Sequence, residues 1–409
     1  MKKLLVILTI FSFFLTNTAS AKLFNVTATR VSNSQTVSAS FDSVEEALDY
    51  FDGQNLNNVF GANVDNEAVN IALNYRGLNA SLAYDTGSNL TLNIDGIVSN
   101  QVFSGANRDA SVELLKDYLK SDGGDILNRI NKRLAAVSPT DPIAGNPTSL
   151  MSQMVDDDFD LAFVDSIHDN SSTGNEMGVG AKYSSFNVSG IKSDVISIAP
   201  FSYRDNFGNS NFKLLLKIPT LKMIQTEGEA KTYQASAAVG MLFPIVKDIW
   251  SISPMLSIGA VGSEDLGSAA AMRGISATNK LGFKTKDGFG IHLGTLFGNY
   301  ATEKLKINDY ESDPKIQNNI LKNSLVFTLP LDKQYVVDLA ATNNRFFGSD
   351  LYIENAMDYS VALVKTSRND NNEMKLDLKY YTYDAARTAS IGNGKKDVRG
   401  FAVNLQFQY

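Results

Sequence analysis

Few side chains in this chain are of the kinds that carry out covalent chemistry. It has no Cys and only two His residues. A thiolate nucleophile, a disulfide and a thiolate metal site are therefore excluded, and little is left for zinc or haem. A serine hydrolase needs a Ser on a sharp turn with His and acid partners, and no G-x-S-x-G motif is present. We expect no enzyme activity, no catalytic residue and no cofactor.

The two His residues lie in different settings. His292 alternates with the apolar residues Ile291 and Leu293, so in a strand it points to the opposite face from them. We interpret it as a hydrogen-bonded residue on the polar face and not as a catalytic base. His168 lies in a polar loop, and we assign it no role.

Four carboxylates crowd into one short segment, at Asp156, Asp157, Asp158 and Asp160. Alternate positions from Asp156 match the first three ligands of a calcium loop. The Gly required next is replaced by Leu161, and no Glu follows at the twelfth position. We therefore predict the charged end of a helix and no metal site.

The clearest periodic pattern is in the last residues of the sequence. One strand face would carry Phe401, Val403, Leu405, Phe407 and Tyr409, with small and polar residues between them. In a soluble sandwich such a strand is an aggregation-prone edge, whereas a membrane barrel pairs it with the first strand. We predict a barrel-closing strand, and the alternative is an edge strand of a soluble all-β domain.

The same alternation recurs from residue 176 onward, in about twelve segments. The connections alternate between short ones (244–249, 284–288, 332–334) and long polar ones (262–274, 301–320, 342–358, 384–398). Outer-membrane barrels combine short periplasmic turns with long external loops, and aromatic residues flank the short connections here as in an interfacial girdle. We predict an all-β transmembrane antiparallel barrel of about 12 strands over residues 176–409, with both ends in the periplasm.

The beginning of the sequence predicts export. Lys2 and Lys3 precede an apolar run, and Ala19-Ser20-Ala21 is a typical cleavage site. Residues 1–21 are thus expected to be a Sec-type signal peptide, and the lack of Cys near the cut excludes a lipoprotein anchor. The net charge of -7 argues against nucleic-acid binding.

A small α+β domain is predicted for residues 22–140. Ser43 and Glu46 form a capping box that opens a short helix, which Gly53 ends. A three-stranded meander over 69–94 and two amphipathic helices follow. Residues 141–175 are predicted to be a linker, with a helix over 148–163 in the barrel lumen.

The predicted lumen face of the barrel carries an excess of Lys. These are Lys182, Lys213, Lys217, Lys280, Lys284, Lys322, Lys375 and Lys379, against Asp338 and Asp377. On the lipid face each Lys would cost about 2–4 kcal/mol at the bilayer midplane. Two interpretations stay open: the lysines only keep the lumen wet, or they hold an acidic segment or favour anions. The four Asp residues lie just before the first strand, so we predict that they enter the lumen.

A signal peptide, an N-terminal domain, a helical linker and a barrel with an aromatic terminal strand together resemble a monomeric autotransporter. The resemblance covers residues 148–409 and is greater to the solitary autotransporter-like barrels, because the N-terminal domain of about 120 residues shows no β-helix repeat. It implies a translocator barrel in the outer membrane of a Gram-negative bacterium, a helix in the lumen and an N-terminal domain outside. Its implied partners are outer-membrane lipid, periplasmic chaperones and the barrel assembly machinery.

The alternative is a porin-like channel for small solutes, with anions as one option, whose N-terminal domain stays in the periplasm as a plug or binding module. A barrel enzyme is a third class, and it lacks a catalytic constellation. The sequence leaves open whether residues 22–140 are exported, which solute or passenger activity is involved, and the oligomeric state.

Overall fold

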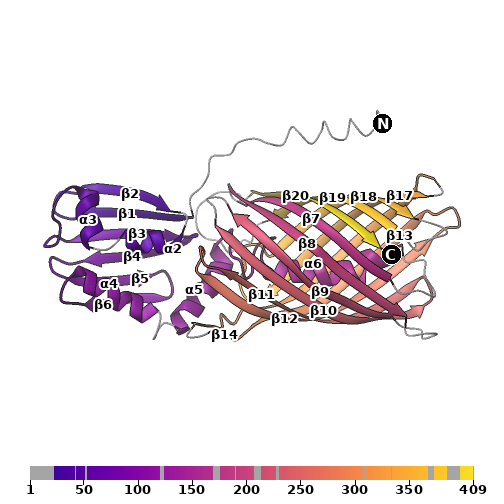
Figure 1. Ribbon diagram of the computed structural model, residues 1–409, viewed down its shortest axis with the longest axis horizontal. Coiled ribbons are helices and arrows are strands. Elements are labelled where there is room, and N and C mark those ends of the chain that lie inside the picture. The colour runs from indigo at the N-terminus through magenta and orange to yellow at the C-terminus, as the bar shows by residue number, and fades with distance from the viewer. Residues whose placement is uncertain are drawn as a thin grey trace, which may run out of the picture.

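The structure is a computed structural model that describes residues 23–408, with gaps at 42, 51–52, 120–123, 169–175, 189, 207–212, 227–229, 308–309, 333, 367–372 and 385–396. The expected signal peptide and Tyr409 lie outside the described residues, as does the side chain of Lys213. Figure 1 shows a barrel with a smaller domain at one end.

The larger part is a closed antiparallel barrel of twelve strands, which confirms the predicted fold class. The strands are β7 (Glu176–Val188), β8 (Ile191–Asn206), β9 (Lys213–Thr226), β10 (Lys231–Val246), β11 (Trp250–Ser263), β12 (Ser268–Lys284), β13 (Gly290–Glu303), β16 (Gln317–Pro330), β17 (Tyr335–Gly348), β18 (Asn355–Thr366), β19 (Glu373–Asp384) and β20 (Asp397–Gln408). The hairpin of β14 (Leu305–Ile307) and β15 (Tyr310–Ser312) lies between β13 and β16.

The strands are longer than the alternation indicated, and the connections at one end are shorter. The long loops expected over 262–274 and 342–358 are wrong, because β11 ends at Ser263, β12 begins at Ser268 and β17 continues to Gly348. The start of β12 carries Ala on both faces (Ala269, Ala270, Ala271), and β17 carries the polar pair Asn343 and Asn344, so the period of two fades although the backbone ladder continues. Side chains add to this ladder, since the Asn343 amide donates to Asn355 Oδ1 at 2.8 Å.

The terminal strand closes the barrel. β20 pairs with β19 on one side and with β7 on the other, where Leu405 lies opposite Ala181 and Phe407 opposite Val179. Leu405 is exposed on the outer surface, whereas Ala402 of the same strand is buried on the inner surface. The outer surface elsewhere carries exposed apolar side chains such as Leu256, Ile258, Ile275, Leu293, Phe297, Val361 and Leu363.

The smaller part is an antiparallel six-stranded sheet in the order β2-β1-β3-β4-β5-β6. Its strands are β1 (Phe24–Arg30), β2 (Thr36–Phe41), β3 (Val69–Tyr75), β4 (Leu78–Tyr84), β5 (Asn89–Ile94) and β6 (Val98–Ser104). Helices α2 (Val44–Asp49), α3 (Gly53–Phe60) and α4 (Arg108–Asp117) accompany it. One sheet face packs with these helices in a core that includes Val26, Ile71, Leu82, Leu56 and Val112.

One expectation for this domain needs correction. The backbone N–H of Glu46 donates to Ser43 Oγ at 3.2 Å, as a capping box requires. Gly53, however, begins α3 and does not end the preceding segment, because a Gly at a helix start loses little compared with one in the interior. The three-stranded meander expected over 69–94 corresponds to β3, β4 and β5, which are part of the six-stranded sheet.

Helix α5 (Gly124–Val137) and the segment after it connect the sheet domain to the barrel. The segment 138–149 has no regular structure, but nearly all of it is buried, so it is a packed connection and not an open linker. The backbone N–H groups of Tyr352 and Ile353 donate to the carbonyls of Ala135 and Gly145 at 2.7 and 3.0 Å. Gly145 has φ +92°, and a Cβ there would lie 2.2 Å from the Ala135 carbonyl oxygen, so this close approach requires glycine.

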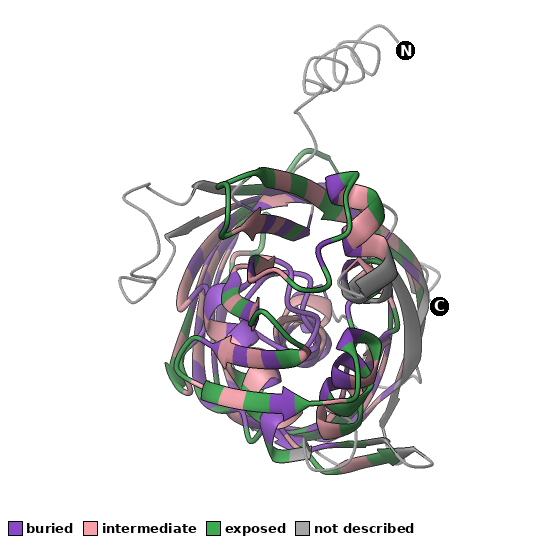
Figure 2. Ribbon diagram, turned by 90° about the vertical axis from the view of Figure 1, so that its left-hand side faces the viewer, coloured by how far each residue is buried: buried purple, intermediate pink, exposed green. Residues whose placement is uncertain are grey.

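Helix α6 (Leu150–Ala162) follows inside the barrel and is succeeded by the short helix η3 (Val164–Ser166). Figure 2, a view along the barrel, shows a helix enclosed by the wall. The chain therefore passes from the small domain through the lumen to the far end, where β7 begins (Figure 1). Among the described residues, no helix combines the length and the apolar character needed to cross a membrane.

Adjacent positions on the terminal strand allow a test of the two barrel faces. Leu405→Lys should assemble poorly, because a Lys facing lipid costs about 2–4 kcal/mol at the midplane and less near the interfaces. Gln406→Lys should assemble normally, because the Gln406 amide faces the lumen and donates to Asp165 Oδ1 at 3.2 Å. The yield of heat-modifiable protein in outer-membrane fractions measures assembly, and equal yields would show that the face assignment is wrong.

Candidate functional site

The candidate site is the barrel lumen and the helix that occupies it. One side of α6 is apolar, with Leu150, Met151, Met154, Val155 and Phe159 almost fully buried. They form one cluster with Phe163 and with wall residues that include Val261, Met272, Leu296, Tyr300 and Val326. The helix is therefore packed against β11, β12, β13 and β16 as in a protein core, and it does not float in a water-filled channel.

Two glycines in the wall make room for this packing. A Cβ at Gly259 would lie 2.7 Å from Met154 Sδ, and one at Gly294 would lie 2.7 Å from the Phe163 ring. A real Cβ does not approach another atom so closely, so any larger residue at either position must displace the lumen segment. Gly inside a strand often marks such a close approach. Gly259 and Gly294 were thus a signal in the sequence for the contact between wall and helix, and we did not predict it.

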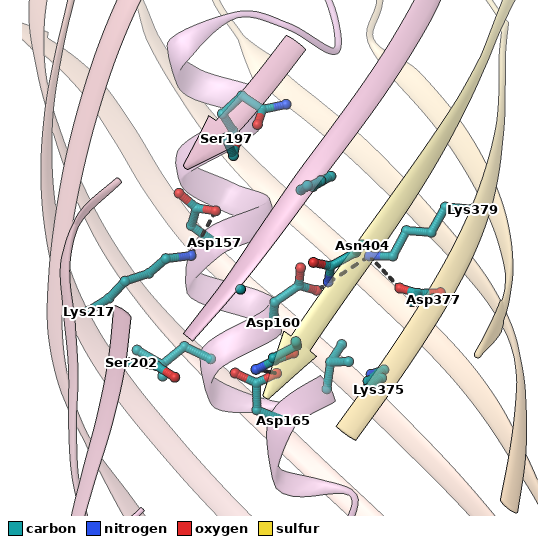
Figure 3. Close-up of a pocket in the computed structure, with 16 residues that line it drawn as sticks. Asp157, Asp160, Asp165, Ser197, Ser202, Lys217, Lys375, Asp377, Lys379 and Asn404 are labelled. Carbon is teal, nitrogen blue, oxygen red and sulfur yellow. Dashed lines mark hydrogen bonds and ion pairs between the residues drawn. The ribbon is translucent and has the colours of Figure 1, made fainter. Parts of the chain in front are cut away.

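The other side of α6 is acidic and meets lysines of the wall. The ion pairs are Lys322 with Asp156 (2.6 Å), Lys217 with Asp157 (2.8 Å) and Lys379 with Asp160 (3.7 Å). The lysines come from β16, β9 and β19, so the helix is held from three directions; Figure 3 shows the last two pairs. Asp158 lies among neutral donors instead, and accepts from Tyr300 Oη at 2.7 Å and from Ser257 Oγ at 2.8 Å.

The remaining predicted lysines occupy different places. Lys182 and Lys375 line a cavity between α6 and the wall, together with Asp377. Lys280 Nζ donates to the Ser166 carbonyl beyond the helix. Lys284 is exposed at the end of β12, away from α6. Asp338, the other expected lumen carboxylate, is buried near the helix exit.

The cavity beside α6 has a volume of about 60 Å³, which is room for a few water molecules. It lies on the side of β7, β8, β9, β19 and β20, opposite the apolar packing (Figure 3). A sugar or another organic solute would not fit into it. Two further cavities beside α6 are smaller still, at about 20 and 30 Å³, so none of these three cavities between described residues holds such a solute.

The segment after α6 is fixed to the wall by contacts that we did not predict. His168 Nε2 lies 2.6 Å from Asp338 Oδ2, and Thr328 Oγ1 donates to the other oxygen of Asp338 at 2.7 Å. Our assignment of no role to His168 is thus wrong, because its side chain is almost fully buried in this contact. The residues of this pair are 170 positions apart, and no local pattern joins them.

His292 points inward from β13 and is buried, while Leu293 is exposed outside. The expected hydrogen bond is not seen at its Nδ1, which has no partner among the described residues. Within the part of the chain that the structure describes, no group of three or more His, Asp or Glu residues could hold a metal ion.

The other end of the lumen is joined to the small domain by a buried ion pair. Arg76 donates to Asp141 Oδ2 at 3.0 Å, to the Leu266 carbonyl at 2.9 Å and to Ser268 Oγ at 3.0 Å. Tyr75 Oη donates to the same carbonyl of Leu266 at 3.0 Å. Burial raises the pKa of the Asp141 carboxyl, and the Arg76 guanidinium acts against that shift. Because both charges lose their water, the pair fixes the position of the domain more than it adds stability.

Enlarging a wall glycine should loosen the helix. We expect Gly294→Val to displace Phe163 and to raise proteolysis of 150–168 in the folded barrel, because the new side chain takes the place of the ring. Gly262→Val is the matched control, since a Cβ at Gly262 meets no atom within 4 Å. Limited proteolysis of both purified variants measures the difference, and an equal cleavage rate would contradict the packing.

Removing the carboxylates of α6 should have a related effect. With Asp156, Asp157, Asp158 and Asp160 all changed to Asn, the three ion pairs are lost while the wall lysines stay. Each wall lysine then lacks its counter-charge on α6 in a partly dehydrated space, so the helix is held less firmly and we expect higher single-channel conductance or noise in planar bilayers. Asp109→Asn with Asp117→Asn, both on α4, should leave the conductance unchanged. Equal conductance of all three proteins would place the acidic side outside any ion path.

No protein-family model matches the chain, and no curated protein matches it in sequence. Solved outer-membrane barrels are similar to it in structure. The translocator domain of the autotransporter NalP from Neisseria meningitidis is 13% identical, with 63% of this chain and 96% of that chain covered and a TM-score of 0.42. The β-domain of the Bordetella autotransporter BrkA is 8% identical over 57% and 98% of the two chains, with a TM-score of 0.40.

An outer-membrane channel from Pseudomonas putida F1 is 10% identical, with 59% of this chain and 97% of that chain covered and a TM-score of 0.40. The chain is thus similar to autotransporter barrels and to a channel barrel alike. At these identities the likeness concerns the fold alone and does not choose between the two functions.

Proposed function

We propose that this protein is an autotransporter-like barrel of the outer membrane that displays its small domain outside the cell and keeps α6 in its lumen as a plug. The observation that carries the proposal is the path of the chain. It leaves the small domain, passes through the lumen as α6 and reaches the opposite end, where β7 begins. The small domain and the first barrel strand thus start from opposite ends of one channel.

The turns supply the orientation. The end at which β7 begins holds the connections 247–249, 285–289 and 331–334, all short, whereas the opposite end combines short connections (264–267, 349–354) with the two longest, 304–316 and 385–396. Outer-membrane barrels carry their short turns on the periplasmic side. With that orientation the small domain lies outside the cell, as the resemblance to autotransporters implies. The rival placement, a periplasmic domain, would require the barrel to be inverted.

The outer surface of the barrel supports a membrane location. Exposed side chains such as Ile258, Phe297 and Phe283 are 67%, 59% and 62% exposed, more than a soluble protein would leave open to water over so many strands. The polar side chains of the same strands point inward, and every strand has a partner on both sides. Both properties are what lipid requires of a β-barrel.

The contacts in the lumen support the plug. Three ion pairs, the apolar packing of Met154 and Phe163 and the His168–Asp338 contact hold the segment along its whole length. The three cavities beside α6 that described residues line are each too small for an organic solute. A channel function therefore requires α6 to move.

The second candidate function is an anion channel that opens when α6 leaves. It is favoured by Lys182 and Lys375, which line the cavity and for which the described residues provide no ion pair. With α6 gone, Lys217, Lys322 and Lys379 would also face water and attract anions. This function would use the same barrel in a second conformation.

Accessibility to a protease from outside the cell tests the proposed orientation. A site-specific protease sequence inserted at Thr86-Gly87-Ser88, the exposed turn between β4 and β5, should be cleaved by protease added to intact cells. The same sequence at 286–287, between β12 and β13, should be cleaved only after the outer membrane is opened. Protection of the first site in intact cells, with cleavage after opening, would show that the domain is periplasmic.

A further inference from the structure

The two edges of the six-stranded sheet differ in how they are protected. Strand β6 has a register irregularity against β5 and carries Asn100 with a φ of 53°. Both edge strands also pack against a helix, β6 against α4 and β2 against α2. Strand β2 pairs with β1 in unbroken register from Thr36 to Phe41. It contains no Pro, no charged residue and no bulge, which are the usual devices that keep an edge strand from adding a partner.

The hydrogen-bond pattern shows which backbone groups of β2 are free to pair. The N–H of Arg30 donates to the Gln35 carbonyl at 2.9 Å, which makes these two residues a hydrogen-bonded pair. In an antiparallel ladder such pairs alternate, so Val37, Ala39 and Phe41 direct their backbone groups to β1. The backbone groups of Thr36, Ser38 and Ser40 therefore point away from the sheet.

The side chains of these three residues are ordered and exposed. Ser38 Oγ lies 3.0 Å from Thr27 Oγ1, Thr36 Oγ1 lies 3.1 Å from Thr29 Oγ1, and Ser40 Oγ donates to Asn25 Oδ1 at 2.7 Å. These contacts direct the three hydroxyls toward β1 and away from the open edge. Little side-chain freedom remains to be lost when a further strand is added.

The solvent face of the sheet is also uncharged. On its outward positions it carries Asn25, Thr27, Thr29, Thr36, Ser38, Ser40, Asn70, Ala72, Asn79, Ser81 and Thr91. Charged residues make up 20% of the chain, and its net charge is -7. When two identical molecules meet through the same surface, each charge on that surface faces a like charge and repels it. Strand β2 and the outward strand positions named above carry no charge, so this repulsion does not arise there.

We propose that β2 pairs with β2 of a second copy of this chain, antiparallel and about a two-fold axis. Residues that lie opposite each other must share a sheet face. Among the registers that meet this condition, the one that pairs all three outward-pointing residues sets Thr36 against Ser40, Val37 against Ala39 and Ser38 against Ser38. Every free N–H and C=O of Thr36, Ser38 and Ser40 then gains a partner, about six backbone hydrogen bonds in all. The contact is the same patch on both molecules, as two-fold symmetry requires.

The direction of β2 decides how the two barrels are placed. In Figure 1 the strand runs along the long axis of the molecule, as the barrel does. An antiparallel partner is turned end over end, so its barrel points the opposite way. The two copies are therefore anchored in two membranes that face each other. This last step rests on the proposed display of the domain outside the cell.

The absence of Cys from the chain permits a direct test of the pairing. In the purified full-length protein, Ser38→Cys should give a covalent dimer with a short thiol crosslinker, because the two residues lie opposite each other on the axis. Ser81→Cys, exposed on the same face but in the inner strand β4, should give none above the level of random collision. Equal crosslinking at both positions, or none at either, overturns the pairing.

A charge at the same position gives a second measurement. Ser38→Lys places two like charges against each other in the paired state, and it should convert dimers to monomers in sedimentation experiments. Ser81→Lys adds the same charge away from the edge and should leave the dimers intact. Loss of dimers in both variants would show that the face, and not the edge, makes the contact, and would refute the proposal.

An experiment with two mixed cell populations distinguishes the pairing of β2 from the proposed display of the domain outside the cell. Two populations that carry Ser38→Cys with different epitope tags are combined, and adducts that contain both tags are sought after crosslinking. Such adducts are expected, because the contact joins two membranes. Crosslinking of the purified protein without mixed adducts would retain the pairing and reject the display outside the cell. No crosslinking in either experiment, with the 86–88 site still cleaved from outside, would reject the pairing alone.

Discussion

The structure depends on one constraint, which is that a barrel in lipid must pair all its backbone groups with itself. Closure of β20 onto β7 meets this requirement. Once the strand number is fixed, the lumen has a fixed width that side chains of the wall do not fill. In this chain the segment before the first strand fills it, so the path of α6 and the position of the small domain both follow from closure.

Charge makes the barrel and the helix depend on each other. Lysines on the inner wall and carboxylates on α6 would each be costly in a narrow, partly dry space without a partner. Paired, they add little to stability but fix the rotation and depth of the helix, because Lys217, Lys322 and Lys379 reach it from different strands. The apolar side of the helix provides the larger favourable term. The apolar side of α6 thus provides most of the binding free energy between helix and wall, and the acidic side fixes the position of the helix in the lumen.

The sequence allowed the strands, their inward and outward faces and the acidic lumen segment to be predicted, because each depends on a local period or on local composition. Leu405 faces the outer surface and Gln406 faces the lumen because successive side chains of a strand point to opposite faces, and the same alternation is visible in the sequence. The predicted end of β17 was wrong, because Asn343 and Asn344 make both strand faces polar there and the alternation no longer marks the strand. The contacts of His168 with Asp338 and of Arg76 with Asp141 could not be predicted, because they join distant segments whose packing only the folded chain defines.

The junction at Arg76 has a mechanical consequence. A domain attached only by a flexible linker would transmit any pull directly to α6 and draw it out of the barrel. Here Arg76 and Tyr75 also donate hydrogen bonds to the Leu266 carbonyl in the loop between β11 and β12. Tension on the domain is therefore shared with the barrel wall. The wall strands are loaded along their length, where many hydrogen bonds resist together. A load on the small domain would thus be borne by the barrel wall before it reached the helix in the lumen.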